Sequence, residues 1–228
     1  MSGDEYRPMM SAERAKRLRE WHDDAYHLQR ANLPTRMSFM GLDLHVPEDV
    51  FAPPDLAEGD PFHQAVLAEV RPADRVLDMG TGSGVSAILA ARVSSRVVAV
   101  DINPKAVYCA SANAARNGVR DCITFLTSDV FETVEGEFDL IVFDPPFRWF
   151  TPRDLLEMST ADENYRALTT FMVQAREHLR PGGRILLNFG SSGDIDYVHN
   201  LIDRAGFKKD VASYGEVAKH GITAEYYT

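Results

Sequence analysis

The 228-residue sequence is poor in cysteine and has neither a long apolar run nor an excess of positive charge. Its two cysteines, Cys109 and Cys122, fall in a predicted helix and at the start of a predicted strand, so we expect buried free thiols rather than a disulfide framework. No uncharged run approaches the roughly 18 residues of a membrane span, and the N-terminal stretch lacks the apolar core of a signal peptide. We therefore expect a cytoplasmic protein with no membrane contact.

Basic residues are also scarce, since 34 acidic residues face 24 lysines and arginines and the formal net charge is -10. Nucleic-acid binding depends on basic side chains that neutralise phosphates, so this balance disfavours a nucleic-acid partner without excluding one. The seven histidines lack the spacing, to one another or to cysteine, that metal ligands show. We predict no protein metal site.

Length and composition predict one α/β domain with a modest extension, because 45% of the residues are hydrophobic and 25% are charged. Apolar residues recur at three- and four-residue steps over residues 11–30, which indicates an amphipathic helix. A proline-punctuated stretch at 46–62 is expected to be a loop that lies against the main domain. We predict that residues 1–60 form an N-terminal extension, acting as a lid or contacting a substrate or partner, and that residues 61–228 form the main domain.

From residue 73 onward, short apolar runs alternate with helical segments. The predicted strands are residues 75–79, 96–101, 123–129, 138–144 and 184–190. The predicted helices lie near residues 84–93, 104–117, 163–179 and 194–205. Near-continuous apolar strands separated by helices predict a parallel sheet covered on both faces. Two extended segments near the C-terminus are expected to form an antiparallel pair at the sheet edge.

In an open α/β sheet, ligands bind outside the carboxyl ends of the strands. Four acids stand at four successive predicted strand ends, namely Asp78, Asp101, Asp129 and Asp144. The first strand runs into "LDMGTGSGVSA" (77–87), a glycine-rich turn that lets a ligand approach the backbone. Val85 stands where a dinucleotide fingerprint requires its third glycine, and Asp78 suits a cationic group better than a pyrophosphate.

Four motifs together carry a resemblance. "VLDMGTGSG", "VVAVDINP", "TSDVF" and "DPPF" look like the successive motifs of class I S-adenosylmethionine-dependent methyltransferases, and the last resembles the motif of N-methyltransferases. The resemblance covers about residues 73–228. It implies a Rossmann-like fold with a mostly parallel seven-stranded sheet, an antiparallel edge strand and helices on both faces.

The resemblance implies S-adenosyl-L-methionine as cofactor and S-adenosyl-L-homocysteine as product. Asp78 would lie near the cationic amino end, Asp101 would bind the ribose hydroxyls, and Asp129 would accept from the adenine amino group. The turn would line the methionine and ribose part, and two apolar residues follow the strand ends. The cofactor-binding residues implied are Asp78, Gly80, Thr81, Gly82, Gly84, Asp101, Ile102, Asp129 and Val130.

The "DPPF" motif supplies what methylation of a poorly nucleophilic nitrogen needs. The Asp144 carboxylate and the Pro145 carbonyl, held in direction by Pro146, would take the two N–H bonds and aim the lone pair at the methyl group. Phe147 would stack on a planar group or face the sulfonium methyl. We predict these four residues as the catalytic set.

Three aromatic residues are candidates for contact with a substrate. Trp149 and Phe150 follow the motif closely, and Phe51 lies in the proline-rich stretch upstream. Apolar rings after such a site are as often packing for the next helix as a substrate wall.

Three classes of methyl acceptor stay open: a glutamine side chain in a protein, a base amino group in RNA, and a small-molecule amine or amino-acid-like metabolite. The order of motifs is similar to HemK-like enzymes, which methylate a glutamine side chain in peptide release factors but carry Asn and Tyr where this chain has Asp144 and Phe147. "FDLIVFDPPFR" resembles ribosomal-RNA guanine amino methyltransferases. We predict an N-methyltransferase acting on a small molecule or a protein side chain. The alternatives are an rRNA or tRNA base amino methyltransferase and a non-methylating enzyme that uses the same cofactor, for example in a cyclisation.

Overall fold

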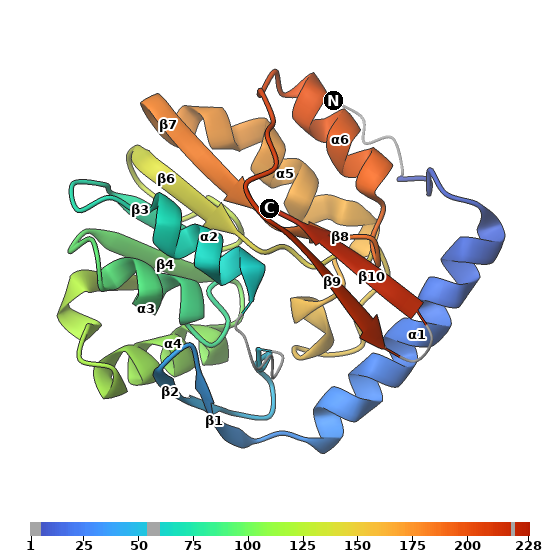
Figure 1. The fold of residues 1–228 in the computed structure, drawn as a ribbon, viewed down its shortest axis with the longest axis horizontal. Coiled ribbons are helices and arrows are strands. Elements are labelled where there is room, and N and C mark those ends of the chain that lie inside the picture. The colour runs from blue at the N-terminus through green and yellow to red at the C-terminus, as the bar shows by residue number, and fades with distance from the viewer. Residues whose placement is uncertain (1–5, 54–59, 220–221) are drawn as a thin grey trace.

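A five-stranded parallel sheet in the order β5-β4-β3-β6-β7 forms the centre of the protein (Figure 1). The computed structural model describes residues 6–53, 60–219 and 222–228. The sheet strands are β3 (Val76–Met79), β4 (Val97–Asp101), β5 (Ile123–Thr127), β6 (Phe138–Phe143) and β7 (Leu179–Leu187). All five strands predicted from the sequence are present, and their parallel pairing is confirmed.

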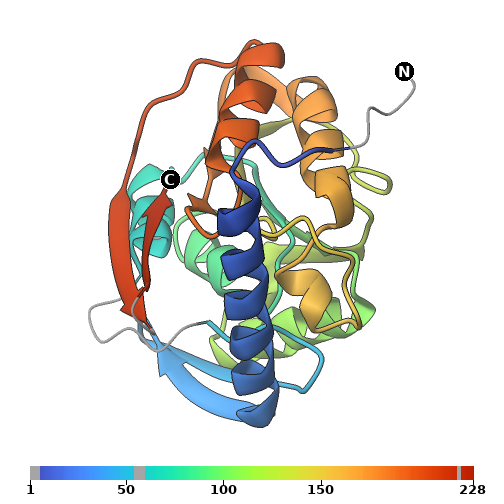
Figure 2. The same ribbon diagram turned by 90° about the vertical axis from the view of Figure 1, so that its right-hand side faces the viewer.

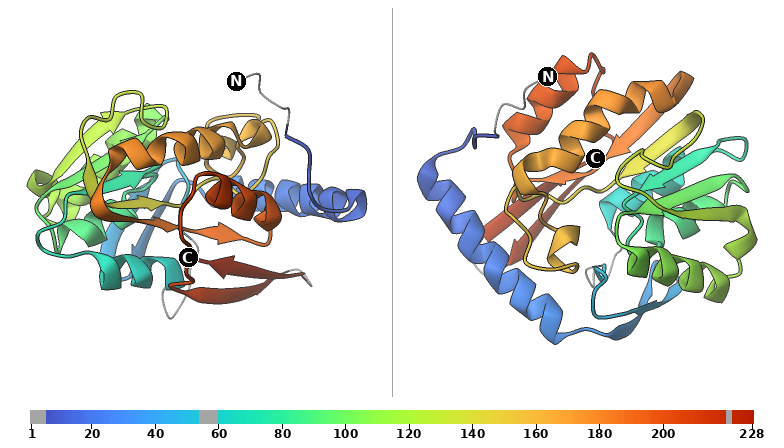
Figure 3. Two further views of the ribbon diagram at one scale, coloured as in Figure 1. Left: turned by 90° about the horizontal axis from the view of Figure 1, so that it is seen from above. Right: turned by 180° about the vertical axis from the view of Figure 1, so that it is seen from behind.

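Helices cover both faces of the sheet, as the apolar strands predict (Figure 3). These helices are α2 (Pro61–Glu69), α3 (Val85–Ala91), α4 (Pro104–Arg116), α5 (Arg166–Gln174) and α6 (Ile195–Arg204), while α1 (Ala12–Ala31) lies to one side. Helix α4 begins at Pro104 with the Asn103 side chain accepting from the Lys105 amide, which is the start expected from the sequence. No described helix has the length and apolar character needed to cross a membrane.

Alternation along the strands divides the core into two clusters. Leu140 and Val142 of β6 pack with helices α2, α3 and α4, whereas Ile141 and Phe143 pack with α5 and α6. Successive residues of a strand point to opposite faces, so one strand supplies both clusters. Packing on both faces thereby fixes the strands of the sheet, and the carboxyl ends of neighbouring strands keep their positions relative to one another.

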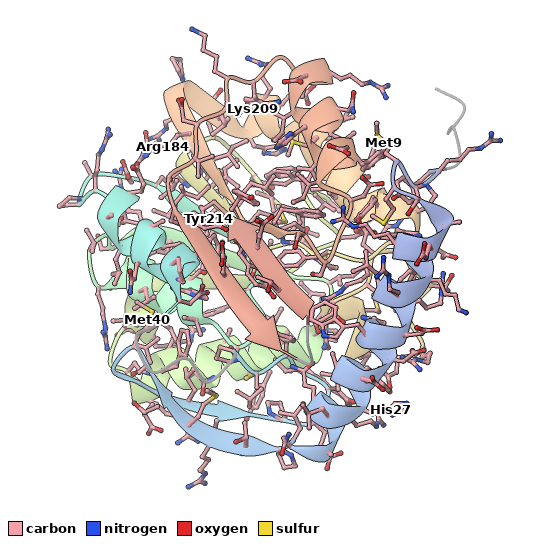
Figure 4. The ribbon with its side chains drawn as sticks, turned by 45° about the vertical axis from the view of Figure 1, so that its right-hand side comes forward. Met9, His27, Met40, Arg184, Lys209 and Tyr214 are labelled. Atoms are coloured by element: carbon pink, nitrogen blue, oxygen red, sulfur yellow. The ribbon has the colours of Figure 1, made fainter. Side chains whose placement is uncertain are left out.

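The C-terminal strands form a small antiparallel sheet rather than a simple continuation of the large one. Strand β8 (Phe189–Gly190) follows β7 after Asn188 and pairs with β10 (Ile222–Tyr227), which pairs with β9 (Tyr214–Lys219). The predicted antiparallel pairing of the last two strands is confirmed for β9 and β10, which form a three-stranded sheet with β8 instead of joining the five-stranded sheet. Figure 4 shows Tyr214 at the start of β9.

The N-terminal part lies along one side of the molecule. Helix α1 runs from the neighbourhood of α6 to a β-hairpin made of β1 (Thr35–Phe39) and β2 (Leu42–Val46), and the labelled Met9 and His27 mark its course (Figures 2 and 4). The hairpin packs on α4, where the His45 amide donates to the Asn113 side chain at 2.9 Å. Its apolar residues belong to the same cluster as α2, α3 and α4. Residues 35–46 are thus built into the main core, and the predicted boundary at residue 60 stays a prediction.

Candidate active site

Four acids lie at the carboxyl ends of neighbouring strands of the parallel sheet, and we call this end of the sheet the edge below. Asp78 is the next-to-last residue of β3, and Asp101 is the last residue of β4. Asp144 directly follows β6, and Asp129 lies two residues beyond β5. The strand order places them in the sequence Asp129, Asp101, Asp78, Asp144 across the edge. The structure therefore brings together residues that are up to 66 positions apart in the chain, since 144 minus 78 is 66.

The glycine-rich turn after β3 is held against the neighbouring strand. The Thr81 amide donates to the Val100 carbonyl at 2.8 Å, and the Gly82 amide donates to the Asp101 carboxylate at 2.9 Å. Gly84 has φ +92°, and a Cβ there would lie 2.9 Å from the Ala110 Cα, so only glycine lets α3 approach α4 this closely. A Cβ on Gly82 would meet no atom nearer than 4.0 Å. The turn is therefore rigid, and it borders open space.

Asp78 is buried beneath this turn. Its carboxylate accepts from the Ala87 amide at 3.2 Å, and the side chain is 4% exposed. Burial raises the pKa of Asp78 to about 6, and the nearby Thr81 hydroxyl and His63 oppose the rise. The Thr81 hydroxyl is itself buried and makes no hydrogen bond of good geometry in the described part of the chain. A cationic ligand group next to Asp78 would stabilise its ionised form.

Asp101 receives two backbone donors, the amides of Gly82 and Asn103, both at 2.9 Å. Burial raises its pKa, and these donors counteract the effect. Ile102 next to it is 40% exposed, which is unusual for a large apolar side chain inside such a cluster of polar groups. Phe51 is half-buried near the start of α4, where the Asn103 side chain donates to the Asp49 carbonyl at 2.9 Å. This apolar surface lies on the Asp101 side of the edge rather than the Asp144 side.

Asp129 is paired with Arg166 at the start of α5. The guanidinium approaches the carboxylate at 2.9 Å, and both side chains are partly exposed. Val130 has φ +51°, which is strained for a β-branched residue, and its carbonyl accepts from the Ser128 hydroxyl. A hollow of about 420 Å³ follows α5 from Arg166 to His178. Asp129 lines this hollow and Asp144 does not, so the hollow belongs to the Asp129 side of the four acids.

Asp144 directly follows β6, which lies between β3 and β7 in the sheet. One of its carboxylate oxygens accepts from the Asn188 side-chain amide at 2.9 Å, and Asn188 is fixed in turn by its own amide, which donates to the Phe143 carbonyl at 2.9 Å. The other oxygen has no described hydrogen-bond donor, and the side chain is exposed. Asp144 is thus held in one orientation with one oxygen available to a ligand.

The surroundings of Asp144 keep its proton affinity high. Burial by surrounding protein raises its pKa to about 7, Asn188 and His63 oppose the rise, and the carboxylates of Asp60 and Asp78 add to it. Water in the open site screens part of this effect, and a bound ligand would displace that water. His63 is nearly buried in α2, and its Nδ1 lies 2.7 Å from Asp60.

The rest of the predicted catalytic set is rigid. Pro145 is buried, and its carbonyl accepts no described hydrogen bond. The Phe147 carbonyl accepts from the Tyr165 hydroxyl at 2.6 Å, while the Phe147 ring packs 5.1 Å from the ring of Phe189. Pro146 and Phe147 are half-buried. The segment after Asp144 is therefore anchored at Phe147 by Tyr165 and Phe189, and the Pro145 carbonyl is free to accept.

Trp149 and Phe150 are in the core rather than on the wall of the open site. They are 8% and 4% exposed and pack with Tyr6 and His22 of the N-terminal segment. A direct contact of either ring with a substrate stays a prediction. Their position favours the packing alternative.

Three polar residues near Asp144 were not singled out from the sequence, namely Asn188, Asp60 and His63. Asn188 follows the fifth strand directly, so the strand-end argument that found the four acids extends to it. Asp60 lies in the stretch predicted as loop (46–62) and His63 directly follows that stretch, where α2 in fact begins with Asp60 as its N-cap and Pro61 at its first position. Nothing in the local pattern pointed His63 toward Asp144.

The edge fits the cofactor that the sequence implies. There is open space above Gly82, and the Thr81 hydroxyl has no described partner and can donate. Asp78 supplies a buried negative charge, and Ile102 supplies an exposed apolar surface. Asp78, Asp101 and then Ile102 with Asp129 follow one another in the order of the amino group, the ribose and the base of S-adenosylmethionine. We predict these residues, with the others of the glycine turn, as the cofactor-binding set.

Comparison with known proteins places the chain in a family. The methyltransferase small domain matches residues 42–193. The release factor glutamine methyltransferase of Cereibacter sphaeroides is 33% identical over 186 residues, which cover 75% of this chain and 64% of that protein. A putative protein N5-glutamine methyltransferase of Methanocaldococcus jannaschii is 30% identical over 181 residues, which cover 76% of this chain and 88% of that protein.

Solved structures show the same fold. The T. thermophilus 16S rRNA N2 G1207 methyltransferase, solved with AdoMet and guanosine, superposes with a TM-score of 0.55 at 22% identity, covering 85% of this chain and 49% of that one. The ribosomal protein L11 methylase of Lactobacillus delbrueckii subsp. bulgaricus gives a TM-score of 0.52 at 23% identity over 73% of this chain and 76% of that one. The family predicted from the four sequence motifs is confirmed: the chain belongs to the methyltransferase small domain family, and its domain is that of an S-adenosylmethionine-dependent methyltransferase.

Proposed function

We propose that the chain transfers the methyl group of S-adenosylmethionine to an amine or amide nitrogen of a small molecule or a protein side chain. The observation that carries the proposal is Asp144, which is fixed by Asn188 through one oxygen and open at the other, beside a Pro145 carbonyl that accepts no described hydrogen bond. S-adenosylmethionine, when bound, supplies an electrophilic methyl group on a sulfonium. The two acceptors take the N–H bonds of the attacking nitrogen and aim its lone pair.

The same two acceptors stabilise the charge that develops on nitrogen during attack. A carboxylate near a growing positive charge in a site that excludes water contributes more than it does in bulk water. Asp144 need not be a strong base, because an amide or ring nitrogen becomes strongly acidic once it is alkylated, while an aliphatic amine attacks in its unprotonated form and its product can keep its charge. Its first role is orientation, and proton acceptance follows.

The relatives leave the acceptor undecided. Those named above act on glutamine in protein, and one structural neighbour acts on rRNA. This chain spans 64% of the Cereibacter sphaeroides protein, so part of that protein has no counterpart here. Aspartate at position 144 accepts hydrogen bonds only, whereas a glutamine amide offers a carbonyl as well as its NH₂ group. This favours an amine over a glutamine side chain as the group that is methylated.

The test is transfer of an isotope-labelled methyl group from S-adenosylmethionine, offered separately with a release factor, ribosomal subunits and a pool of cell metabolites, with products identified by mass spectrometry. We expect S-adenosylhomocysteine and a labelled product in at least one reaction. Methylthioadenosine without labelled product would instead reveal chemistry other than methylation. Label on ribosomal RNA would favour the base methyltransferase alternative.

A further inference from the structure

Arg148, the residue directly after the catalytic motif, is a buried cation without a counter-ion. Its side chain is 8% exposed, and no carboxylate pairs with it among residues 6–53, 60–219 and 222–228. Its Nε is buried without a hydrogen-bond partner. Burial lowers its pKa to about 10, so it remains charged at neutral pH. Buried arginines are normally paired, because removing a guanidinium from water is unfavourable unless an anion compensates.

Aromatic rings hold the Arg148 guanidinium in place. It lies 4.7 Å from the centre of the Trp21 ring of α1 and 6.0 Å from that of Phe147. Such contacts with ring faces leave the N–H groups at the edge of the guanidinium free to donate. The backbone of Arg148 is fixed as well, since its carbonyl accepts from the Asp162 amide at 2.7 Å. The side chain is therefore positioned as a donor before any ligand arrives.

Tyr226 of β10 provides a second donor that lacks a partner. Its hydroxyl makes no hydrogen bond in the described part of the chain, and its ring lies 6.0 Å from that of Phe147. Burial raises the pKa of Tyr226, the Arg148 cation opposes this, and the carboxylates of Asp144 and Asp60 add to it. The Tyr226 hydroxyl is thus close enough to both Arg148 and Asp144 to feel their charges. Tyr226 and Arg148 also share a neighbour, since the Tyr226 ring and the Arg148 guanidinium each lie 6.0 Å from the ring of Phe147.

We infer that Arg148 and Tyr226 form a receptor for a carboxylate of the methyl acceptor. The inference rests on the proposed function, and it narrows the acceptor to an amine that carries an acid, such as an amino-acid-like metabolite. The nitrogen lies at Asp144, and the carboxylate accepts from the guanidinium and the phenol. A carboxylate fits better than a phosphate, because a single negative charge balances the one cation and a dianion would be repelled by Asp60 and Asp144.

The charges around this receptor agree with a zwitterionic ligand. Asp144 and Asp60 attract the amine end, which binds as a cation and loses a proton to solvent before its lone pair attacks the methyl group, while Arg148 attracts the acid at the other end. Burial and the Arg148 charge lower the pKa of His22 in α1, and its 2.8 Å contact with Glu157 opposes the effect. Opposite charges at the two ends of the site favour one orientation of the acceptor and disfavour ligands that lack either group.

The first experiment measures binding without requiring turnover. The protein saturated with S-adenosylhomocysteine is titrated by thermal shift and calorimetry with the proteinogenic amino acids and with the carboxamide of each. We expect at least one acid to bind 10-fold or more tightly than its carboxamide. If no acid binds more tightly than its carboxamide, the inference is overturned. If the protein does not bind S-adenosylhomocysteine at all, the proposed function fails instead.

Variants test whether the two residues are the receptor. Arg148→Gln is expected to weaken binding of the selected acid about 100-fold and to leave its carboxamide unchanged, while Arg148→Lys restores part of the affinity. Tyr226→Phe keeps the ring and should weaken the acid about 10-fold. Arg19→Gln is the matched control, since Arg19 also lies over a ring, that of Phe150, but is exposed. Equal acid binding by wild type and Arg148→Gln would contradict the inference.

The carboxylate could also belong to the cofactor, and a further arm separates the two sources. Affinities of wild type and Arg148→Gln are measured for S-adenosylhomocysteine, which has a carboxylate, and for methylthioadenosine, which has none. We expect Arg148→Gln to leave both affinities unchanged. A loss of affinity for S-adenosylhomocysteine alone would assign Arg148 to the cofactor and overturn its assignment to the acceptor.

Discussion

What each carboxylate of the site can do depends on where the residue lies and which groups hold it. Asp78 lies in β3 and Asp144 directly follows the adjacent strand β6, yet Asp78 is buried beneath the glycine turn whereas Asp144 has one oxygen without a described donor. Their raised pKa values have the same first cause, burial, and different consequences. For Asp144, the raised pKa makes turnover depend on its ionisation near neutral pH. For Asp78, it means that the ionised carboxylate destabilises the cofactor-free fold, and a cationic ligand would compensate that charge.

Turnover should follow the ionisation of Asp144. Because only the carboxylate accepts both from Asn188 and from a substrate N–H, and because its pKa is raised to about 7, we expect kcat to rise with pH through about 7 and then level off. Asp144→Asn should lower kcat about 100-fold or more and abolish this rise. The measurement is the pH profile of kcat from 5.5 to 8.5. A flat wild-type profile across this range would refute the assigned role.

Asp78→Asn should stabilise the cofactor-free protein at alkaline pH while weakening the cofactor site. The folded protein holds the Asp78 proton more tightly than the unfolded chain does, so stability is lost as pH rises from about 4 through about 6. The variant should be more stable than wild type by up to about 3 kcal/mol at pH 8 and equally stable near pH 4, since one pKa unit corresponds to about 1.4 kcal/mol.

Urea denaturation of both proteins at the two pH values measures this difference directly. Calorimetry with S-adenosylhomocysteine should show weaker binding by the variant. A variant less stable than wild type at pH 8 would mean that the Asp78 carboxylate supports the fold rather than opposing it.

At the scale of elements, the parallel sheet was predictable because its apolar strands are near-continuous and each is followed by a clear helix or turn signal. The β1–β2 hairpin was not recognised, although Met40 and Gly41 both have positive φ at its turn and the flanking residues alternate. Its alternation spans only five residues per strand, too few to stand out beside proline-rich neighbours. Helix α2 was hidden in the same way, by the prolines around its N-cap.

The site was predictable in part for the same reason. The four acids and the glycine turn follow strands that the sequence makes obvious, so their convergence could be inferred. Arg148, Tyr226 and His63 take their significance from contacts between distant segments, such as α1 against the loop after β6. No local pattern encodes such contacts, and only the packed structure reveals them.

The approach of α3 to α4 depends on Gly84. Gly84→Ala should lower the free energy of unfolding by about 2–4 kcal/mol, because the added Cβ meets the Ala110 backbone in addition to the strain of a left-handed φ. Gly118→Ala is the control, since Gly118 has φ +72° with no atom within 4 Å of a Cβ, and it should cost about 1 kcal/mol. Equal losses in urea denaturation would show that the close approach of the helices adds nothing.

At the scale of the whole molecule, charge and the placement of α1 define which acceptors can reach the site. Helix α1 crosses one side of the protein and places Trp21 against Arg148, so the N-terminal segment forms part of the surroundings of the site (Figure 2). The net charge of -10 repels polyanions. Both features favour a compact acceptor over a nucleic acid.

Binding to RNA should be weak at physiological salt. An enzyme that holds ribosomal RNA by phosphate contacts loses affinity steeply as salt rises. The acidic balance of this chain makes its affinity for RNA low even before salt is added. We expect no binding to a ribosomal RNA fragment above about 0.1 M salt in a filter or fluorescence assay. Tight binding with a steep dependence on salt would instead support the base methyltransferase alternative.

The measurement that tests the central claim most directly is the chemical position of the transferred methyl group. Carbon-13-labelled S-adenosylmethionine is incubated with the acceptor found in the screen, and the product is examined by NMR. We predict an N-methyl signal with wild type and none with Asp144→Ala, although that variant binds S-adenosylhomocysteine as tightly as wild type does. A methyl group on oxygen, sulfur or carbon, or undiminished turnover by Asp144→Ala, would contradict the account.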